Sequence, residues 1–322
     1  MRYCRRFLTT AQSGCRIYGY LDCAFRAEQL LSEQNEPDWE SQGMIASLKG
    51  VIYAERSEYD KALAEFEKVR NICSKYYGDN DLNTAISYNN IGNVYDKMGD
   101  YQKALIFHQQ ALTILENTVG EMDTDTASSY DNIANSYRKL GDYQKALENY
   151  QKAMTIKERT MGEASPDTAK IYNNIGNLYD DMEEYYQALT YYQKALKIYE
   201  KVYGEMHIST ATIYNNIGDT YDTLGEYPKA LLYQQKALKI KESILGEIHT
   251  STAGAYQSLS ILYLHMMHPE EALQYGLKAW KILDYKLGPQ HPSTLNTRQN
   301  LKLIFKELHP NEDFDRWLSQ QN

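Results

Sequence analysis

The chain repeats itself at a fixed interval of 42 residues. The segment that begins at Thr210, TATIYNNIGDTYDTLGEYPKALLYQQKALKI, closely resembles the segment that begins at Thr168, TAKIYNNIGNLYDDMEEYYQALTYYQKALKI. A unit of this length cannot bury its apolar face alone, so neighbouring units must stack into one elongated core. The repeat therefore predicts a solenoid in which equivalent side chains recur along one wall.

The repeat divides nearly the whole chain into units. Six blocks of 42 residues fit end to end, at 42–83, 84–125, 126–167, 168–209, 210–251 and 252–293. Residues 1–41 fit a degenerate earlier unit, because GYLDCA at 19–24 echoes GDYQKA at 99–104. Residues 294–322 restart the pattern and then lose it, which predicts a partial repeat with C-terminal capping helices. We expect these units to form one continuous domain.

Each block carries two runs of helical periodicity. In block 84–125, Tyr88, Ile91 and Tyr95 form the first run, and the second extends from Ala104 to Leu115. The predicted fold class is therefore all-α, built from antiparallel helix pairs. Small residues recur on both helices, which should let the two backbones approach closely; they are Gly92, Ala134, Gly176 and Gly218 on the first helix, and Ala104, Ala146, Ala188 and Ala230 on the second.

Residues that favour helix ends recur in the same phase. N-cap residues accept a hydrogen bond from an unpaired amide of the first turn. The predicted N-caps are Asn83, Asp125, Asp167, Ser209, Ser251 and Ser293. Glycine ends helices because it adopts left-handed backbone conformations without strain. The predicted helix ends are Gly78, Gly120, Gly162, Gly204, Gly246 and Gly288.

Charge and cysteine usage narrow the function. The net charge of −9 argues against binding to nucleic acid or to an anionic membrane surface. No apolar run approaches the roughly 20 residues that a membrane-spanning helix needs. The four cysteines lack the spacing of a zinc site, which favours a reducing, cytoplasmic location. The arginine-rich first twenty residues leave open either a mitochondrial presequence or an ordinary helix.

The sequence lacks the motifs of the common catalytic and metal sites. No glycine-rich phosphate loop, GxSxG motif or catalytic Cys–His pair is present. His207, His249 and His291 recur in phase, but stacking places equivalent residues one repeat apart, too far to share a metal ion. We therefore expect a chain with no catalytic activity, no cofactor and no bound metal.

The repeated pattern YNNIGxxY…GxYxKAL…QKALxI resembles the tetratricopeptide repeat. The 42-residue period, with LGExH before the next helix, is similar to the subfamily found in kinesin light chains. This resemblance implies a right-handed superhelical solenoid in which the first helix of each repeat lines the concave face. It is specific for fold and weak for biological role.

Polar residues on the first helices are the candidate binding residues. The set is Asn89, Asn90, Asn93, Asp131, Asn132, Asn135, Asn173, Asn174, Asn177, Asn215, Asn216 and Asp219. An asparagine amide both donates and accepts hydrogen bonds, so a row of them can bond the backbone of an extended peptide. The kinesin light chain resemblance implies the same use. Alternatively, these asparagines bond to the neighbouring repeat and only space the stack.

Two refinements follow from charge and architecture. The later repeats carry Asp180, Asp181, Asp219 and Asp222, which would favour a partner with basic segments. This differs from the basic groove expected of a kinesin light chain that binds acidic cargo. We expect an interaction scaffold for protein or peptide partners. The alternatives are the interaction array of a larger enzyme, such as a fused ADP-ribosyltransferase, a kinesin-light-chain-like cargo adaptor, or a regulator of phosphatase or transcription-factor type.

Overall fold

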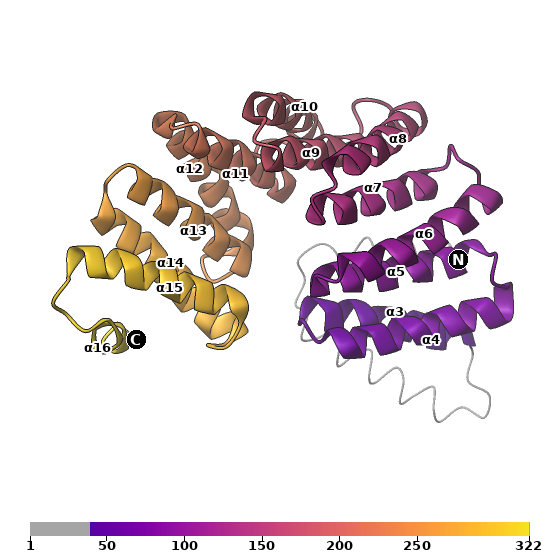
Figure 1. Ribbon diagram of the computed structural model, residues 1–322, viewed down its shortest axis with the longest axis horizontal. Coiled ribbons are helices and arrows are strands. Elements are labelled where there is room, and N and C mark those ends of the chain that lie inside the picture. Colours follow the sequence, from indigo (N-terminus) through magenta and orange to yellow (C-terminus); the bar gives the residue numbers. More distant parts are fainter. Residues whose placement is uncertain (1–38, 322) are drawn as a thin grey trace. The chain divides into compact units, whose positions relative to one another are not determined.

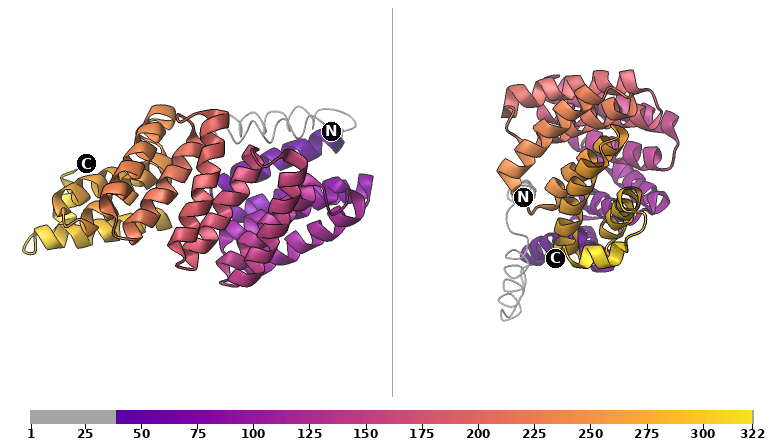
Figure 2. Two further views of the ribbon diagram at one scale, coloured as in Figure 1. Left: turned by 90° about the horizontal axis from the view of Figure 1, so that it is seen from above. Right: turned by 90° about the vertical axis from the view of Figure 1, so that its left-hand side faces the viewer.

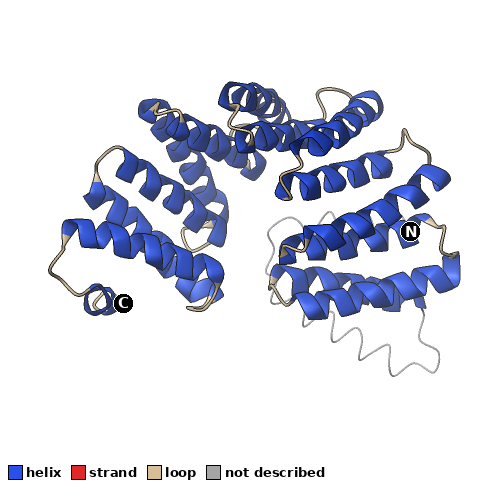
Figure 3. Cartoon of the chain, viewed as in Figure 1, coloured by secondary structure: helices blue, strands red, loops and turns tan. Residues whose placement is uncertain are grey.

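The computed structural model describes residues 39–321 (Figure 1). Within that range the chain forms 14 helices and no strand (Figure 3), which confirms the predicted all-α fold class. The degenerate unit expected at 1–41 and the arginine-rich segment lie outside the described residues, except for the first three residues of helix α3.

The helices alternate between two kinds along the chain. The first helices of the repeats are α3 (Trp39–Glu55), α5 (Leu82–Met98), α7 (Thr124–Lys139), α9 (Pro166–Asp181), α11 (Ile208–Thr223), α13 (Thr250–His265) and α15 (Pro292–Leu308). The second helices are α4 (Tyr59–Tyr77), α6 (Tyr101–Thr118), α8 (Tyr143–Met161), α10 (Tyr185–Tyr203), α12 (Tyr227–Leu245) and α14 (Pro269–Leu287), and the short α16 (Phe314–Ser319) follows α15.

The described chain divides into two compact units, and the division in the sequence falls between Glu163 and Ala164. In each unit, a second helix packs against the first helix of its own repeat and against the first helix of the next (Figure 2). First helices of neighbouring repeats also contact each other, α5 with α7 and α11 with both α9 and α13, whereas no pair of second helices among the described residues does so to a similar extent. The first helices therefore form the inner side of each unit.

The observed N-caps of the first helices lie two residues before the predicted ones. The N-caps are Asp81, Asp123, Ser165, His207, His249 and His291. Five of these side chains accept a hydrogen bond from the backbone N–H of the residue that was predicted as the cap, as Asp81 does from Asn83 at 2.8 Å. The prediction was wrong because it chose the residue whose backbone N–H donates the capping hydrogen bond, rather than the residue two positions earlier whose side chain accepts it.

The predicted helix-ending glycines have positive φ, between 84° and 99°. The ψ angles are extended at five of them, Gly78, Gly162, Gly204, Gly246 and Gly288, so the chain leaves the helix directly for the loop. A second positive-φ position lies in the turn inside each repeat. It is glycine in three repeats, Gly99, Gly141 and Gly225, and a residue with a side chain in three others, Ser57, Glu183 and Met267.

In five of the six repeats, the side chain at one position on the second helix fills the space left by the small residue on the first helix. We call its occupants the plug residues: Phe66, His108, Tyr150, Tyr192, Gln234 and Gly276. A Cβ added at Gly176 would lie 2.5 Å from the Tyr192 ring, and one added at Gly92 would lie 2.5 Å from the His108 ring. The small residues therefore make room for a plug side chain.

Candidate functional site

Three plug residues reach past the small residue to a candidate side chain on the first helix. The Tyr150 hydroxyl donates to Asn135 Oδ1 at 2.8 Å. Tyr192 makes the same bond to Asn177 at 2.8 Å. In the next repeat, Gln234 Nε2 donates to Asp219 Oδ1 at 2.9 Å. The core thus fixes the orientation of one candidate side chain in each of these repeats.

In the first unit, the plug residue His108 joins a network across three helices. Its ring is fully buried, with Nδ1 2.9 Å from Asn89 Oδ1 and Nε2 3.1 Å from Asp96 Oδ2. Asn89 Nδ2 donates to Ser129 Oγ on α7 at 2.7 Å, and Ser136 Oγ donates to Asp96 at 2.8 Å. Both polar ends of Asn89 are therefore bonded inside the protein.

In the second unit, three candidate asparagines form a cluster that we call the asparagine triad: Asn173, Asn177 and Asn216. Asn216 Nδ2 on α11 donates to Asn173 Oδ1 at 2.8 Å and to Asn177 Oδ1 at 3.2 Å, both on α9. Within the described part of the chain, the Nδ2 groups of Asn173 and Asn177 and the Oδ1 of Asn216 make no hydrogen bond, and none of these atoms is enclosed. The triad therefore presents two donors and one acceptor.

Asn215 differs from the triad because its polar atoms are occupied. Its Nδ2 donates to Asp219 Oδ2 at 2.6 Å and to Ser258 Oγ at 3.3 Å, and its Oδ1 accepts from Lys241 Nζ at 3.2 Å. Burial raises the pKa of Asp219 to about 6, although the hydrogen bonds from Ser258 and Asn215 and the charge of Lys241 oppose the rise.

The remaining candidates differ in accessibility. Asn93 is exposed, and Asn90, Asn132 and Asn174 are half-buried. The side chains of Asn90, Asn93 and Asn132 make no hydrogen bond within residues 39–321. Asp131 is only 2% exposed, so the structure does not present it at the surface, contrary to our expectation.

The predicted acidic stretch is also partly enclosed. Asp222 is 9% exposed, and both of its carboxylate oxygens lie within 3.0 Å of His265 Nδ1 on α13. Asp180 accepts a hydrogen bond from Thr220 Oγ1 at 2.9 Å. Asp180 thus links α9 to α11, and Asp222 links α11 to α13.

The three repeating histidines have a structural role that the sequence analysis did not assign to them. Nδ1 of His207, His249 and His291 accepts the backbone N–H two residues later, at 3.1, 3.0 and 3.2 Å respectively. No group of three or more His, Cys, Asp or Glu side chains suited to a metal ion occurs over residues 39–321. Over the same residues, no helix is long and apolar enough to cross a bilayer.

Comparison with known proteins identifies the family. A family model described as tetratricopeptide repeat matches residues 41–117, 125–185 and 167–243, more than half of the chain. The chain is a tetratricopeptide repeat protein. This confirms the family predicted from the repeated motif. A search of curated proteins found no match.

Solved structures show the same fold at low sequence identity. The apo quorum sensor NprR from B. thuringiensis has a TM-score of 0.68 at 15% identity, covering 99% of this chain and 84% of its own. BtubC (BKLC) from P. vanneervenii has a TM-score of 0.58 at 23% identity, covering 71% and 92%. A putative kinesin light chain from Podosopora anserina, with nearly identical repeats, has a TM-score of 0.50 at 18% identity, covering 63% and 95%. These likenesses concern the fold.

Proposed function

We propose that this tetratricopeptide repeat protein is a non-catalytic scaffold that binds an extended peptide segment of a partner protein along its first helices. The asparagine triad is the observation that carries the proposal. Asn216 Nδ2 donates to the side-chain oxygens of both Asn173 and Asn177. Two donors and one acceptor of the triad then remain accessible on the inner side of the second unit.

The triad suits a peptide backbone because of its chemistry and its rigidity. An extended backbone offers C=O acceptors and N–H donors along its length. Asn216 holds Asn173 and Asn177 in place, and Tyr192 holds Asn177 from inside the core, so little side-chain freedom is lost on binding. Each bond contributes about 0.5–1.5 kcal/mol net, so three bonds alone give weak binding. Further affinity must come from contacts with the peptide side chains.

The structure narrows the proposed contact set. In the first unit, Asn90, Asn93 and Asn132 have amides that are not engaged within the described residues, and we propose that they contact peptide. Three candidates have their polar atoms bonded to neighbouring side chains or backbone, so we assign them a positioning role; they are Asn89, Asn135 and Asn215.

Of the four aspartates expected to favour a basic partner segment, we keep this role only for the two on α9. Asp222 is paired with His265, and burial raises the pKa of Asp219. Asp180 and Asp181 lie at the C-terminal end of α9, and we propose that a basic residue of the peptide is favoured there.

Selection from a random dodecapeptide display library, using the full chain as bait, tests the proposal. The affinities of selected peptides are then measured for the wild type and for N173A/N177A/N216A. The control variant Q193A/Q235A/Q274A removes three amides from exposed positions on second helices of the same unit. We expect the triad variant to lose at least tenfold in affinity and the control to match the wild type. Failure to select any peptide, or equal binding to the triad variant, contradicts the proposal.

A further inference from the structure

The repeat at 252–293 differs from the others at its plug position. Where other repeats place Phe, His, Tyr or Gln, this one has Gly276, and Ser260 replaces the small residue opposite. The first-helix position that holds Asn177 and Asp219 in earlier repeats is here Ile261. The polar link from the core to the inner surface is therefore missing, together with the volume of a large side chain.

A cavity of about 440 Å³ occupies this place, between α13, α14 and α15. Both Gly276 and Ser260 line it, which ties the opening to the missing plug. A Cβ added at Gly276 would lie 3.0 Å from Ser260 Oγ and 3.1 Å from Leu301 Cδ1, so these two side chains take the space directly beside Gly276, and both also line the cavity. The Ser260 hydroxyl donates to the Ala272 carbonyl at 2.7 Å.

The lining selects for a neutral apolar group. None of the residues that line the cavity is charged. Ile261, Leu264 and Ile304 form apolar walls, and the amides of Gln257 and Asn300 lie among the polar lining residues. A charged group entering this site would lose hydration without gaining a counter-ion. An aromatic or long aliphatic side chain would instead gain apolar burial.

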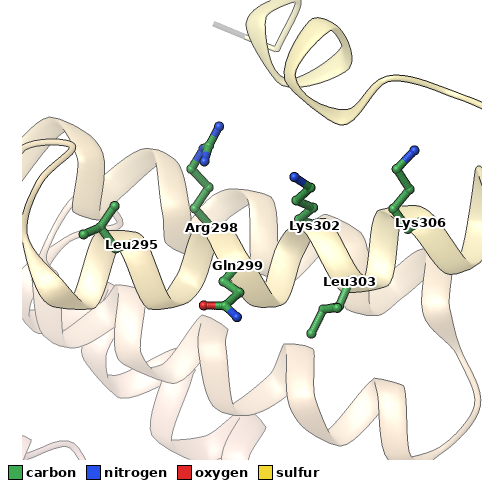
Figure 4. Close-up of a pocket in the computed structure, with 6 residues that line it drawn as sticks. All are labelled: Leu295, Arg298, Gln299, Lys302, Leu303 and Lys306. Atoms are coloured by element: carbon green, nitrogen blue, oxygen red, sulfur yellow. The ribbon is translucent and has the colours of Figure 1, made fainter.

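A second hollow lies along α15 (Figure 4), and we do not assign it as a binding site for the peptide. Figure 4 shows Leu303 pointing away from the side on which Arg298 and Lys306 project. Arg298 forms an ion pair with Asp315, and Lys306 donates to the Glu312 carbonyl at 2.6 Å. These cations therefore bind the segment that contains α16.

We propose that the cavity left by Gly276 binds a bulky, neutral aromatic or aliphatic side chain of the peptide that lies on the asparagine triad. The inference rests on the proposed function, because the peptide backbone carries the anchor side chain to the site. Ile261 on α13 occupies the same repeat position as Asn177 on α9, within the same unit. A peptide that follows the first helices from α9 thus passes over the cavity.

Filling the cavity with the chain's own plug tests the inference. The variant S260G/G276Y recreates the Gly176–Tyr192 combination, and S260G alone is the control that leaves the cavity open. Library-selected peptides should be enriched in one large apolar residue and should bind S260G/G276Y at least tenfold more weakly than the wild type. Replacing that residue by alanine should weaken binding to the wild type but not to the filled variant. Absence of enrichment, or equal affinity for the filled variant, overturns the inference.

A small probe separates this inference from the peptide-binding function. Methyl NMR with indole should shift the Ile261 and Ile304 resonances in the wild type and in N173A/N177A/N216A, but not in S260G/G276Y. If no peptide is selected while indole still behaves in this way, the peptide-binding function fails, and of the inference only the binding of a bulky neutral group in the cavity stands. If S260G/G276Y does not fold, I261N alters an exposed wall residue instead and should weaken indole binding. No wild-type shift, or an unchanged shift in the filled variant, overturns the cavity assignment.

Discussion

The Tyr192 hydroxyl on α10 donates a hydrogen bond to the Asn177 side-chain oxygen on α9, at 2.8 Å. Tyr150 and Asn135 form the same pair, at the same distance, between α8 and α7. The pairs differ in one respect: the Asn177 oxygen also accepts from Asn216, whereas no other donor to the Asn135 oxygen is found among the described residues. Two chemically equal pairs thus sit in different networks.

Removing the two hydroxyls should have unequal effects on stability. Y150F leaves the Asn135 oxygen without its donor, and we expect a loss of about 1–3 kcal/mol in unfolding free energy. Y192F leaves the Asn177 oxygen bonded to Asn216, so the expected loss is about 0.5–1.5 kcal/mol. Urea unfolding followed by circular dichroism measures both. Equal losses, or a larger loss for Y192F, would show that the second donor does not matter.

The turn inside each repeat offers a stabilising change. Glu183 and Met267 have φ of 61° and 62°, at the position where three other repeats have glycine. A left-handed backbone destabilises a residue with a side chain by about 1–2 kcal/mol, and glycine removes this strain. Part of the resulting stabilisation is lost because glycine also raises the conformational entropy of the unfolded chain. E183G and M267G should each raise stability by about 0.5–1 kcal/mol, measured as the urea midpoint and slope.

A matched glycine elsewhere checks the cause. Q193G places glycine at an exposed position inside α10 and should lower stability by about 0.5–1 kcal/mol. The argument from backbone strain requires opposite signs for E183G and Q193G. A loss in both variants would refute it.

The repeat period predicted most of the fold. A pattern that recurs in phase averages out local ambiguity, so the helix pairs, the positive φ of Gly78 and its equivalents, and the family all followed from the sequence. The helix starts shifted by two residues because several polar residues in each loop can cap, and only the backbone path decides between them. Histidine as an acceptor, at His207 and its equivalents, is a less common cap that residue preferences do not favour.

The site could be predicted only in part, because the role of each asparagine depends on its partners. Asn173 and Asn215 occupy the same repeat position, yet Asn215 is bonded on both sides, whereas Asn173 Nδ2 makes no hydrogen bond among the described residues. One signal was available: Asn135–Tyr150 and Asp219–Gln234 are both 15 residues apart, with a donor matched to each acceptor. Reading it requires the register of the two helices in a hairpin.

Asp219 should give the chain a pH dependence of its own. Its folded pKa of about 6 lies above the value of about 3.9 for an unfolded aspartate, so the folded state holds the proton more tightly. The contribution of Asp219 to stability is therefore largest below the unfolded pKa, falls as the pH rises through the folded pKa of about 6, and is constant from about one pH unit above that value. D219N, which restores the asparagine of the preceding repeat, lacks this titration.

The measurement is the difference in unfolding free energy between D219N and the wild type from pH 4.5 to 7.5. We expect D219N to gain relative to the wild type as the pH rises through about 6, and then to keep a constant difference at the upper end of this range. E247Q, at an exposed position in the loop before α13, is the control and should show no such rise. A difference that does not change with pH would mean that Asp219 titrates normally.

His249 should make the start of α13 sensitive to pH, with the opposite sign. Burial and the positive charge of Lys286 lower its pKa, and only the neutral ring can accept the Ser251 N–H at Nδ1. Its stabilising contribution is therefore complete above the unfolded pKa of about 6.5 and declines as the pH falls below that value.

H249A should lose about 1 kcal/mol in unfolding free energy at pH 8, and the gap to the wild type should narrow by pH 5.5. H249D, which installs the cap found at Asp81 and Asp123, should stay stable at pH 5.5 because its carboxylate remains charged and lies at a helix N-terminus. Thermal unfolding of the three proteins at both pH values decides the matter, since a gap between wild type and H249A that is equal at pH 8 and 5.5 would mean that the ring does not act as a cap.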